Sequence, residues 1–154
     1  MKGKALSKKT FCSFPFPKSF TLVEIMIVIA IIMIIALLSI PQMIRSNISD
    51  NEASVIANLR SVYTALQMFY INNLRTYPTL LSDLSNYISP ALAAGAKSGY
   101  LFVYIRDNED QFHINANPRT PGRTGTNYYY LDETNVITYN SAGEADSNDP
   151  PISN

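Results

Sequence analysis

One carboxylate stands alone in an apolar stretch near the N-terminus. Glu24 is the only charged residue between Phe20 and Ile44, and fourteen consecutive apolar residues follow it, from Ile25 to Leu38. A carboxylate in a membrane span costs about 2.5–3.5 kcal/mol at the helix centre and less near the helix end. Glu24 therefore either lies at a membrane interface, where it is tolerated, or pairs with a cation that another molecule supplies.

Few other residues could carry chemistry. The single histidine, His113, alternates with apolar residues, and we interpret it as an exposed strand residue rather than a base or a ligand. Glu144, Asp146 and Asp149 are oxygen ligands at short spacing, so calcium is a candidate cofactor there, although a solvated acidic tail is the favoured interpretation. The sequence has no Gly-rich phosphate loop, nucleophile elbow or Cys/His cluster, so we expect no enzyme and no catalytic residue.

The charges divide the chain into two parts. Residues 1–19 hold five lysines and no acid, whereas residues 20–154 hold seven basic and twelve acidic side chains. This acidic remainder argues against nucleic acid as the main partner, because phosphate binding needs clustered cations. The one cysteine, Cys12, lies in the basic leader, so the chain without its leader cannot form an internal disulfide.

The apolar stretch is long enough to cross a membrane. The 25 residues from Phe20 to Ile44 would form roughly 37 Å of helix, against a hydrocarbon core of ~30 Å. The lysines before it predict that residues 1–19 are cytoplasmic. An ordinary secretory signal peptide is the alternative, but the sequence after the apolar run, LLSIPQMIRS, matches a small-residue cleavage site poorly.

Beyond Arg45 the apolar residues recur with helical spacing. No proline interrupts this pattern between Pro41 and Pro78, which predicts one helix from about Phe20 to Asn73. Its second half should lie across a small sheet and bury one face. The residues of that face are Val55, Ile56, Leu59, Val62, Tyr63, Leu66, Phe69 and Tyr70.

The rest of the chain shows strand and turn patterns. A short helical turn at residues 83–87 and a loop from Ser89 to Gly99 should precede the strands. Four antiparallel strands, arranged as two hairpins, should then cover the helix, so the predicted fold class is α+β. An acidic tail that ends in prolines follows them. The expected strands are residues 100–105, 111–116, 127–131 and 136–139.

The sequence FTLVE at residues 20–24 resembles a known export signal. With a lysine-bearing leader before it and about twenty apolar residues after it, it is similar to the type III signal of type IV prepilins and type II secretion pseudopilins. The resemblance implies that a prepilin peptidase cuts between Ser19 and Phe20 and methylates the new N-terminus. It also implies a cleaved leader (1–19), a transmembrane and filament-core segment (20–44) and a globular domain (45–154). The residue before the cut is usually Gly, and Ser19 departs from that pattern.

Two further positions gain a role from this resemblance. Pro41 falls where family members often carry a kinking proline, so we expect a bend or a locally melted stretch there. The α-amino group of Phe20 would be cationic after cleavage and would remain so when singly methylated. It could then pair with Glu24 of a neighbouring subunit and set the axial register of a filament.

The function predicted is therefore a structural subunit of a type IV pilus-like filament. Its partners would be copies of itself, the prepilin peptidase, an inner-membrane assembly platform and, before extraction, membrane lipid. It would begin as a single-pass protein of the bacterial inner membrane and end in a periplasmic or extracellular filament. One alternative is a pseudopilin of type II secretion. Another is a membrane-anchored binding module that never polymerises and holds a ligand at Gly95–Gly99 or Pro118–Gly125. The atypical Ser19 favours this alternative, because a chain that is not cut there does not expose the amine that Glu24 needs.

Overall fold

The computed structural model describes residues 21–152, apart from the side chains of residues 38–40. Its residues group into two compact units, one up to Leu38 and one from Ser39 onward, and each is described by itself. A single helix, α1 (Leu22–Asn72), contributes residues to both units. Its bounds lie within two residues of those predicted, and the helix is continuous through Pro41. The backbone at Pro41 is therefore not melted.

Local hydrogen bonds explain where α1 ends. The Asn73 side-chain amide donates to the Phe69 carbonyl (2.9 Å), and the Arg75 N–H donates to the Tyr70 carbonyl (3.0 Å). Leu74 and Arg75 adopt left-handed φ angles of 54° and 62°, which few non-glycine residues adopt. This reversal of the backbone, with Pro78 three residues beyond, stops the helix.

The sheet has five strands, one more than the four predicted. All neighbours are antiparallel and the spatial order follows the sequence, β1-β2-β3-β4-β5. Four of them match the predicted strands to within two residues. The strands are β1 (Ala96–Lys97), β2 (Tyr100–Arg106), β3 (Phe112–Pro118), β4 (Tyr128–Asp132) and β5 (Ile137–Asn140).

The extra strand lies in the segment from Ser89 to Gly99 that was predicted to be a loop. This segment contains a short helix, α2 (Pro90–Ala93), and β1, whose two residues pair with the start of β2. Ser98 and Gly99 form the two-residue turn between them, with φ angles of 52° and 74°. Positive φ at both positions is the geometry of a type I′ hairpin. The helical turn predicted at residues 83–87 begins two residues earlier: the short 3₁₀ helix η1 (Leu81–Leu84) continues into turn residues 85–87, where the Ile88 N–H donates to the Leu84 carbonyl (3.0 Å).

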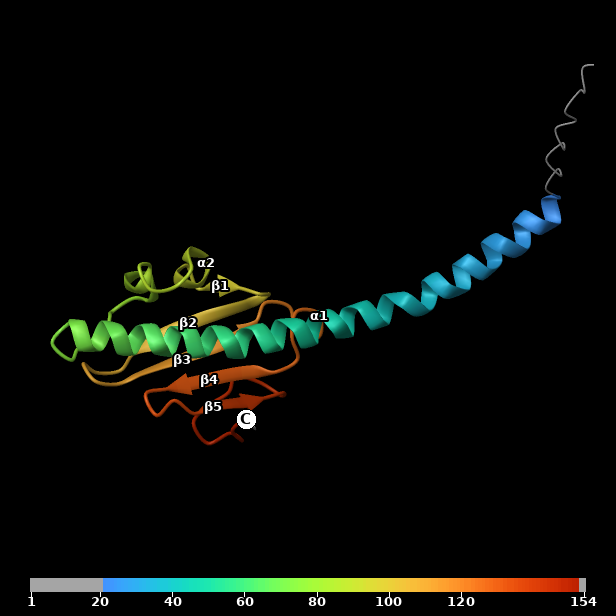
Figure 1. The fold of residues 1–154 in the computed structure, drawn as a ribbon. Helices are drawn as coiled ribbons and strands as arrows, with labels where there is room; N and C mark the ends of the chain where they lie inside the picture. The colour runs from blue at the N-terminus through green and yellow to red at the C-terminus, as the bar shows by residue number, and fades with distance from the viewer. Residues whose placement is uncertain (1–20, 153–154) are drawn as a thin grey trace, which may run out of the picture. The chain divides into compact units, whose positions relative to one another are not determined.

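The predicted apolar face of α1 forms the core of the second unit. Figure 1 shows this part of α1 lying along one face of the sheet. Val55, Leu59, Val62 and Leu66 are fully buried, and the other predicted residues of the face pack against them at partial burial. The sheet contributes the alternate residues Tyr100, Phe102, Phe112, Ile114, Ala116, Tyr129, Leu131 and Ile137. The apolar face of the helix and the apolar face of the sheet thus form one core.

The tail covers the far edge of the sheet. The Ile152 N–H donates to the Ile137 carbonyl (2.9 Å), and the Tyr139 N–H donates to the Pro150 carbonyl (3.1 Å). Ala145 is buried, and the Thr138 hydroxyl donates to the Asp146 carbonyl (2.6 Å). The tail is therefore packed on β5, and the prediction of a merely solvated segment was wrong for its backbone.

Candidate functional site

The first part of α1 carries an apolar surface that nothing in the described chain covers. Its large apolar side chains from Leu22 to Leu37 are 45–77% exposed. An 18-residue window of this helix has a mean hydropathy of 3.1 and none of it is buried, so it is long and apolar enough to cross a membrane; a signal sequence near an N-terminus would share these properties. Exposed apolar area on this scale needs lipid or another protein against it.

Glu24 lies in the first turn of this exposed helix. Thr21 precedes the helix, and the Glu24 N–H donates to the Thr21 hydroxyl (3.2 Å) and to the Thr21 carbonyl (3.1 Å). A threonine cap followed three residues later by glutamate is a favoured helix start, and a negative charge there interacts well with the helix dipole. This local role of Thr21 was not predicted, although the Thr-x-x-Glu spacing is the sequence signal for it.

Of the other residues predicted to act in assembly and processing, only Pro41 lies within the described part of the chain. Pro41 lies inside α1, 17 residues after Glu24, so the structure does not bring the two together. Ser19 and Phe20 lie outside the described residues.

His113 differs from its predicted state as an exposed strand residue. Its side chain is 24% exposed and lies on β3, where Nδ1 is 2.6 Å from the Asp107 carboxylate. The ring also stacks on Tyr130 of β4, with the ring centroids 5.8 Å apart. The two residues are six apart in the sequence and meet because the β2–β3 turn folds the chain back on itself. The contacts tie the turn to the sheet and leave the histidine in a structural role.

The three acidic candidates for calcium in the tail accept hydrogen bonds from the protein itself. Asn117 donates to Glu144 (2.8 Å), and Asn140 donates to Asp149 (3.1 Å). The Asn148 N–H donates to the Asp146 carboxylate (2.7 Å), and the Asp146 N–H donates to the Asp149 carboxylate (2.9 Å), so these two acids order the turn of the tail. Within residues 21–152, no three His, Cys, Asp or Glu side chains lie close enough together to hold a metal ion.

The two loops proposed as ligand-holding segments are shaped by packing. A Cβ on Gly125 would lie 1.9 Å from the Tyr100 hydroxyl oxygen, and one on Gly99 would lie 2.9 Å from Thr124. Glu52 of α1 accepts hydrogen bonds from the next loop residues, Thr126 N–H (2.7 Å) and Asn127 N–H (3.0 Å). Close contact with α1 and β2 thus accounts for these glycines without a ligand.

Buried tyrosines concentrate on the sheet. Tyr129 of β4 is buried, and burial, reinforced by the nearby Glu52 carboxylate, raises its pKa to about 12. Burial also raises the pKa of Tyr100 and of Tyr104. The Tyr100 hydroxyl donates to the Asn127 carbonyl (2.9 Å). These tyrosines serve the packing of the sheet.

Comparisons with known proteins point to the N-terminal segment. Residues 18–40 match a family model described as the prokaryotic N-terminal methylation motif. The matched segment includes Glu24 and the start of the exposed apolar helix. The match agrees with the predicted methylation signal at the N-terminus.

The chain has relatives named as a type IV pilin and as a type II secretion protein, and together with the motif they confirm the predicted resemblance to the type IV pilin and type II secretion pseudopilin family. The chain is 36% identical over 86 residues to the type IV major pilin protein PilA of Myxococcus xanthus, an alignment that covers 56% of this chain and 37% of PilA. It is 29% identical over 110 residues to the type II secretion system core protein G of Escherichia coli, covering 68% of this chain and 75% of that protein. No solved structure matches the chain.

Proposed function

We propose that this protein is a structural subunit of a type IV pilus-like filament. The observation that carries the proposal is the wholly exposed apolar helix with one carboxylate in its first turn, inside a methylation motif. Membrane lipid would cover this surface before assembly, and the helices of other copies would cover it in the filament. The membrane role requires only the apolar run from Ile25, whereas the assembly role also requires Glu24.

Assembly would begin with a cut between Ser19 and Phe20 by a prepilin peptidase, followed by methylation of the new amine. The ammonium group of Phe20 would then pair with Glu24 of a neighbouring subunit. A shift of one residue would leave both charges unpaired in an apolar core, so the pair would favour one axial register. Movement from the membrane into the filament would need an inner-membrane assembly platform.

The variant Glu24→Ala tests this role of the carboxylate. We expect the variant to be inserted and cleaved as the wild type is, but to form few filaments, because the amine of Phe20 lacks its partner. Thr21→Val is the matched control, since it removes the helix cap, worth about 1 kcal/mol, and leaves the charge in place. Filament yield by electron microscopy and sedimentation is the measurement. Wild-type yield from Glu24→Ala would contradict the proposal, as would an equal loss from Thr21→Val.

A pseudopilin of type II secretion is the second candidate. The alignment with core protein G covers 75% of that protein, twice the share of PilA that is covered, although its identity is lower. Deletion of the gene in its native cell separates the two functions. Loss of surface filaments with normal protein export supports the pilus, whereas loss of protein export with intact surface filaments supports the pseudopilus.

A further inference from the structure

The loop between β3 and β4 presents two arginines to solvent. Arg119 and Arg123 are both exposed, and among residues 21–152 neither guanidinium group has an ion-pair or hydrogen-bond partner. The loop itself is well defined, since the Asn51 amide of α1 donates to the Thr124 carbonyl (2.8 Å) and the Gly122 N–H donates to the Gly125 carbonyl (2.9 Å). The two positive charges are therefore held at one place on the surface.

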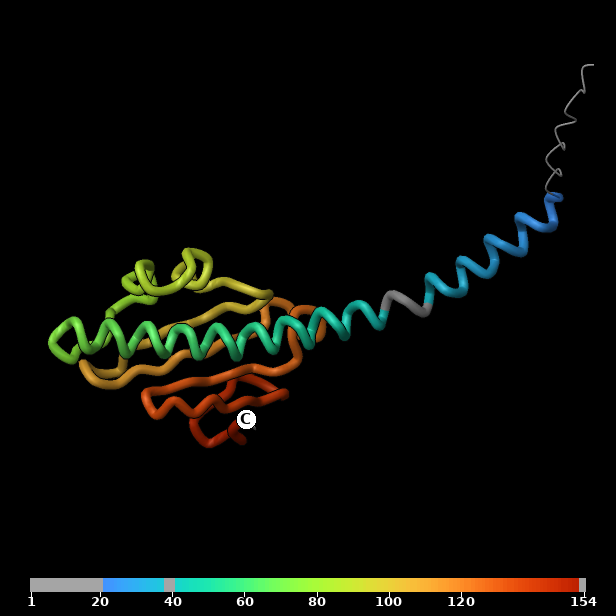
Figure 2. The backbone as a smooth tube through the Cα atoms, viewed as in Figure 1, coloured from blue at the N-terminus to red at the C-terminus, as the bar shows by residue number. Residues whose placement is uncertain are grey.

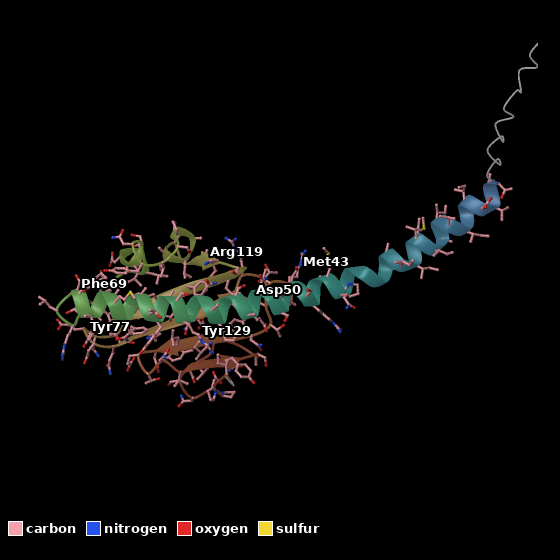
Figure 3. All side chains as sticks on the ribbon, viewed as in Figure 1. Met43, Asp50, Phe69, Tyr77, Arg119 and Tyr129 are labelled. Carbon is pink, nitrogen blue, oxygen red and sulfur yellow. The ribbon has the colours of Figure 1, made fainter. Side chains whose placement is uncertain are left out.

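A hollow adjoins this loop. It has a volume of about 390 Å³, and its lining includes Asn47, Asp50 and Asn51 of α1 together with Thr120, Arg123 and Thr124 of the loop. Figure 3 shows Asp50 and Arg119 at this end of the unit, away from Phe69 and Tyr77. Apart from Ile44 the lining is polar, and Asp50 offsets only one of the two arginine charges. The hollow thus suits an acidic, polar ligand.

The opposite end of the same unit carries the complementary charges. Residues 107–110 form the turn between β2 and β3, and all four are exposed. The Tyr77 N–H donates to the Glu109 carbonyl (2.9 Å), which holds the turn in place. The Glu109 and Asp110 carboxylates have no partner within the described part of the chain.

The strands fix the separation between these two groups of charge. The seven residues of β3 connect the turn to the arginine loop, so they span about 23 Å at ~3.3 Å per residue. Figure 2 shows the β2–β3 turn beside the C-terminal end of α1 and the β3–β4 loop at the other end of the sheet. The two groups therefore cannot meet within one molecule.

We propose that the Arg119 and Arg123 loop of one copy receives the Glu109 and Asp110 turn of a second copy. This inference rests on the proposed filament function and names one of its interfaces. A contact between two different surfaces of identical subunits does not close on itself unless the rotation forms a ring, so it builds an open helical array. Reversing one subunit would bring like charges together, so the contact also selects a single polarity.

Anionic lipid headgroups are the competing ligand for the arginines. Ile44, the last residue of the apolar stretch that began at Phe20, lines the same hollow, so the loop lies close in space to the end of the expected membrane segment. The second copy is favoured because the chain itself supplies two unpaired carboxylates on a projecting turn, matching two unpaired guanidinium groups beside a hollow. Lipid binding is an outcome that the experiment below distinguishes.

Charge exchange in the full-length protein in its native cell tests the contact. Arg119→Glu with Arg123→Glu, and separately Glu109→Arg with Asp110→Arg, should each lower filament yield by roughly tenfold or more, because like charges then face each other. All four substitutions together should restore at least about a third of the wild-type yield, since complementarity returns. Arg75→Glu is the control: it adds a negative charge near the acidic turn and leaves the arginine loop intact, so it should not lower the yield.

The outcomes separate this contact from the proposed function. Filaments at wild-type yield in both double variants would overturn the contact and leave the filament function standing, whereas a wild-type protein without filaments would overturn the function. A loss that the fourfold variant does not reverse, and that follows the phosphatidylglycerol content of the membrane, would assign the arginines to lipid and overturn the contact.

Disulfide cross-linking provides a second test that keeps all four charges. Thr120→Cys combined with Asn108→Cys places one thiol at each surface, and the only natural cysteine, Cys12, lies in the leader. Oxidised filaments should give a ladder of linked multimers, and either single-cysteine variant should give monomers. Filaments of the double-cysteine variant that yield only monomers on oxidation would contradict the contact.

Discussion

Gly125 lies where the loop after β3 passes the ring of Tyr100. A Cβ at this position would lie 1.9 Å from the Tyr100 hydroxyl oxygen and 2.4 Å from its ring carbon Cζ. The same hydroxyl donates to the Asn127 carbonyl (2.9 Å), so the tyrosine is not free to move aside. The glycine is required by the close approach of loop and ring, and it needs no ligand to explain it.

Gly125→Ala should therefore destabilise the globular unit by about 1–3 kcal/mol, the usual cost of an overpacked site. Gly143→Ala is the matched control, because a Cβ there would meet nothing within 4 Å. Thermal unfolding of the two variants, followed by circular dichroism, measures the difference. Equal melting temperatures for the two variants would show that the loop adjusts freely and that the packing argument is wrong.

Tyrosines of the sheet, and Tyr77 just after α1, have hydroxyl groups that stay neutral to high pH. Burial is the largest cause of the raised pKa of Tyr77, Tyr100, Tyr104, Tyr129 and Tyr130, and Tyr129 reaches about 12. An unfolded chain releases these protons near pH 10. The folded protein holds them to higher pH, so the stabilisation is complete below pH 10 and is lost as the pH rises through the folded pKa values.

Alkaline titration should show this effect directly. Above about pH 10, each such tyrosine should lower the free energy of unfolding by about 1.4 kcal/mol per pH unit until its folded pKa is reached. Tyrosinate absorbance of the folded protein should rise at higher pH than that of the chain in denaturant. Urea unfolding at a series of pH values gives the free energy. Superimposed absorbance curves and a constant free energy of unfolding would contradict the burial of these hydroxyl groups.

Helices and strands with a long, regular apolar pattern were predicted correctly from the sequence, whereas the short strand β1 was not. The stripe from Val55 to Tyr70 and the alternating strands from Tyr100 onward predicted the helix, four strands and their shared core. Strand β1 was missed because two residues cannot show an alternating pattern, although the Ser98-Gly99 turn marks it. The packing of the tail on β5 depends on backbone hydrogen bonds. The acidic side chains of the tail predict exposure to solvent and give no sign of these bonds.

The sequence predicted Glu24 as a candidate site residue, but it did not predict the contacts made between separate strands. Glu24 stands out in the sequence because a charge in an apolar run is costly. The His113–Asp107 pair and the separated charges of the β2–β3 turn and the β3–β4 loop depend on which strand ends face each other. That arrangement is a property of the folded sheet, and no spacing in the sequence reports it.

For the whole molecule, two parts of the chain have different requirements. The residues from Val55 onward bury their own core, while the apolar residues from Leu22 to Leu37 remain exposed. The residues from Val55 onward can therefore reach a low free energy by themselves, whereas residues Leu22 to Leu37 require lipid or another protein against them. The filament proposed here meets that requirement only if the leader is removed and the amine of Phe20 becomes available to Glu24.

The mass of the N-terminus, measured on protein purified from its native cell, tests this requirement most directly. The filament proposal predicts a chain that begins at Phe20 and carries one N-methyl group, found both in the membrane and in filaments. Mass spectrometry of the intact protein and of its N-terminal peptide distinguishes the possibilities. An intact Met1, or an unmethylated chain cut after Ser39, would contradict the proposed assembly.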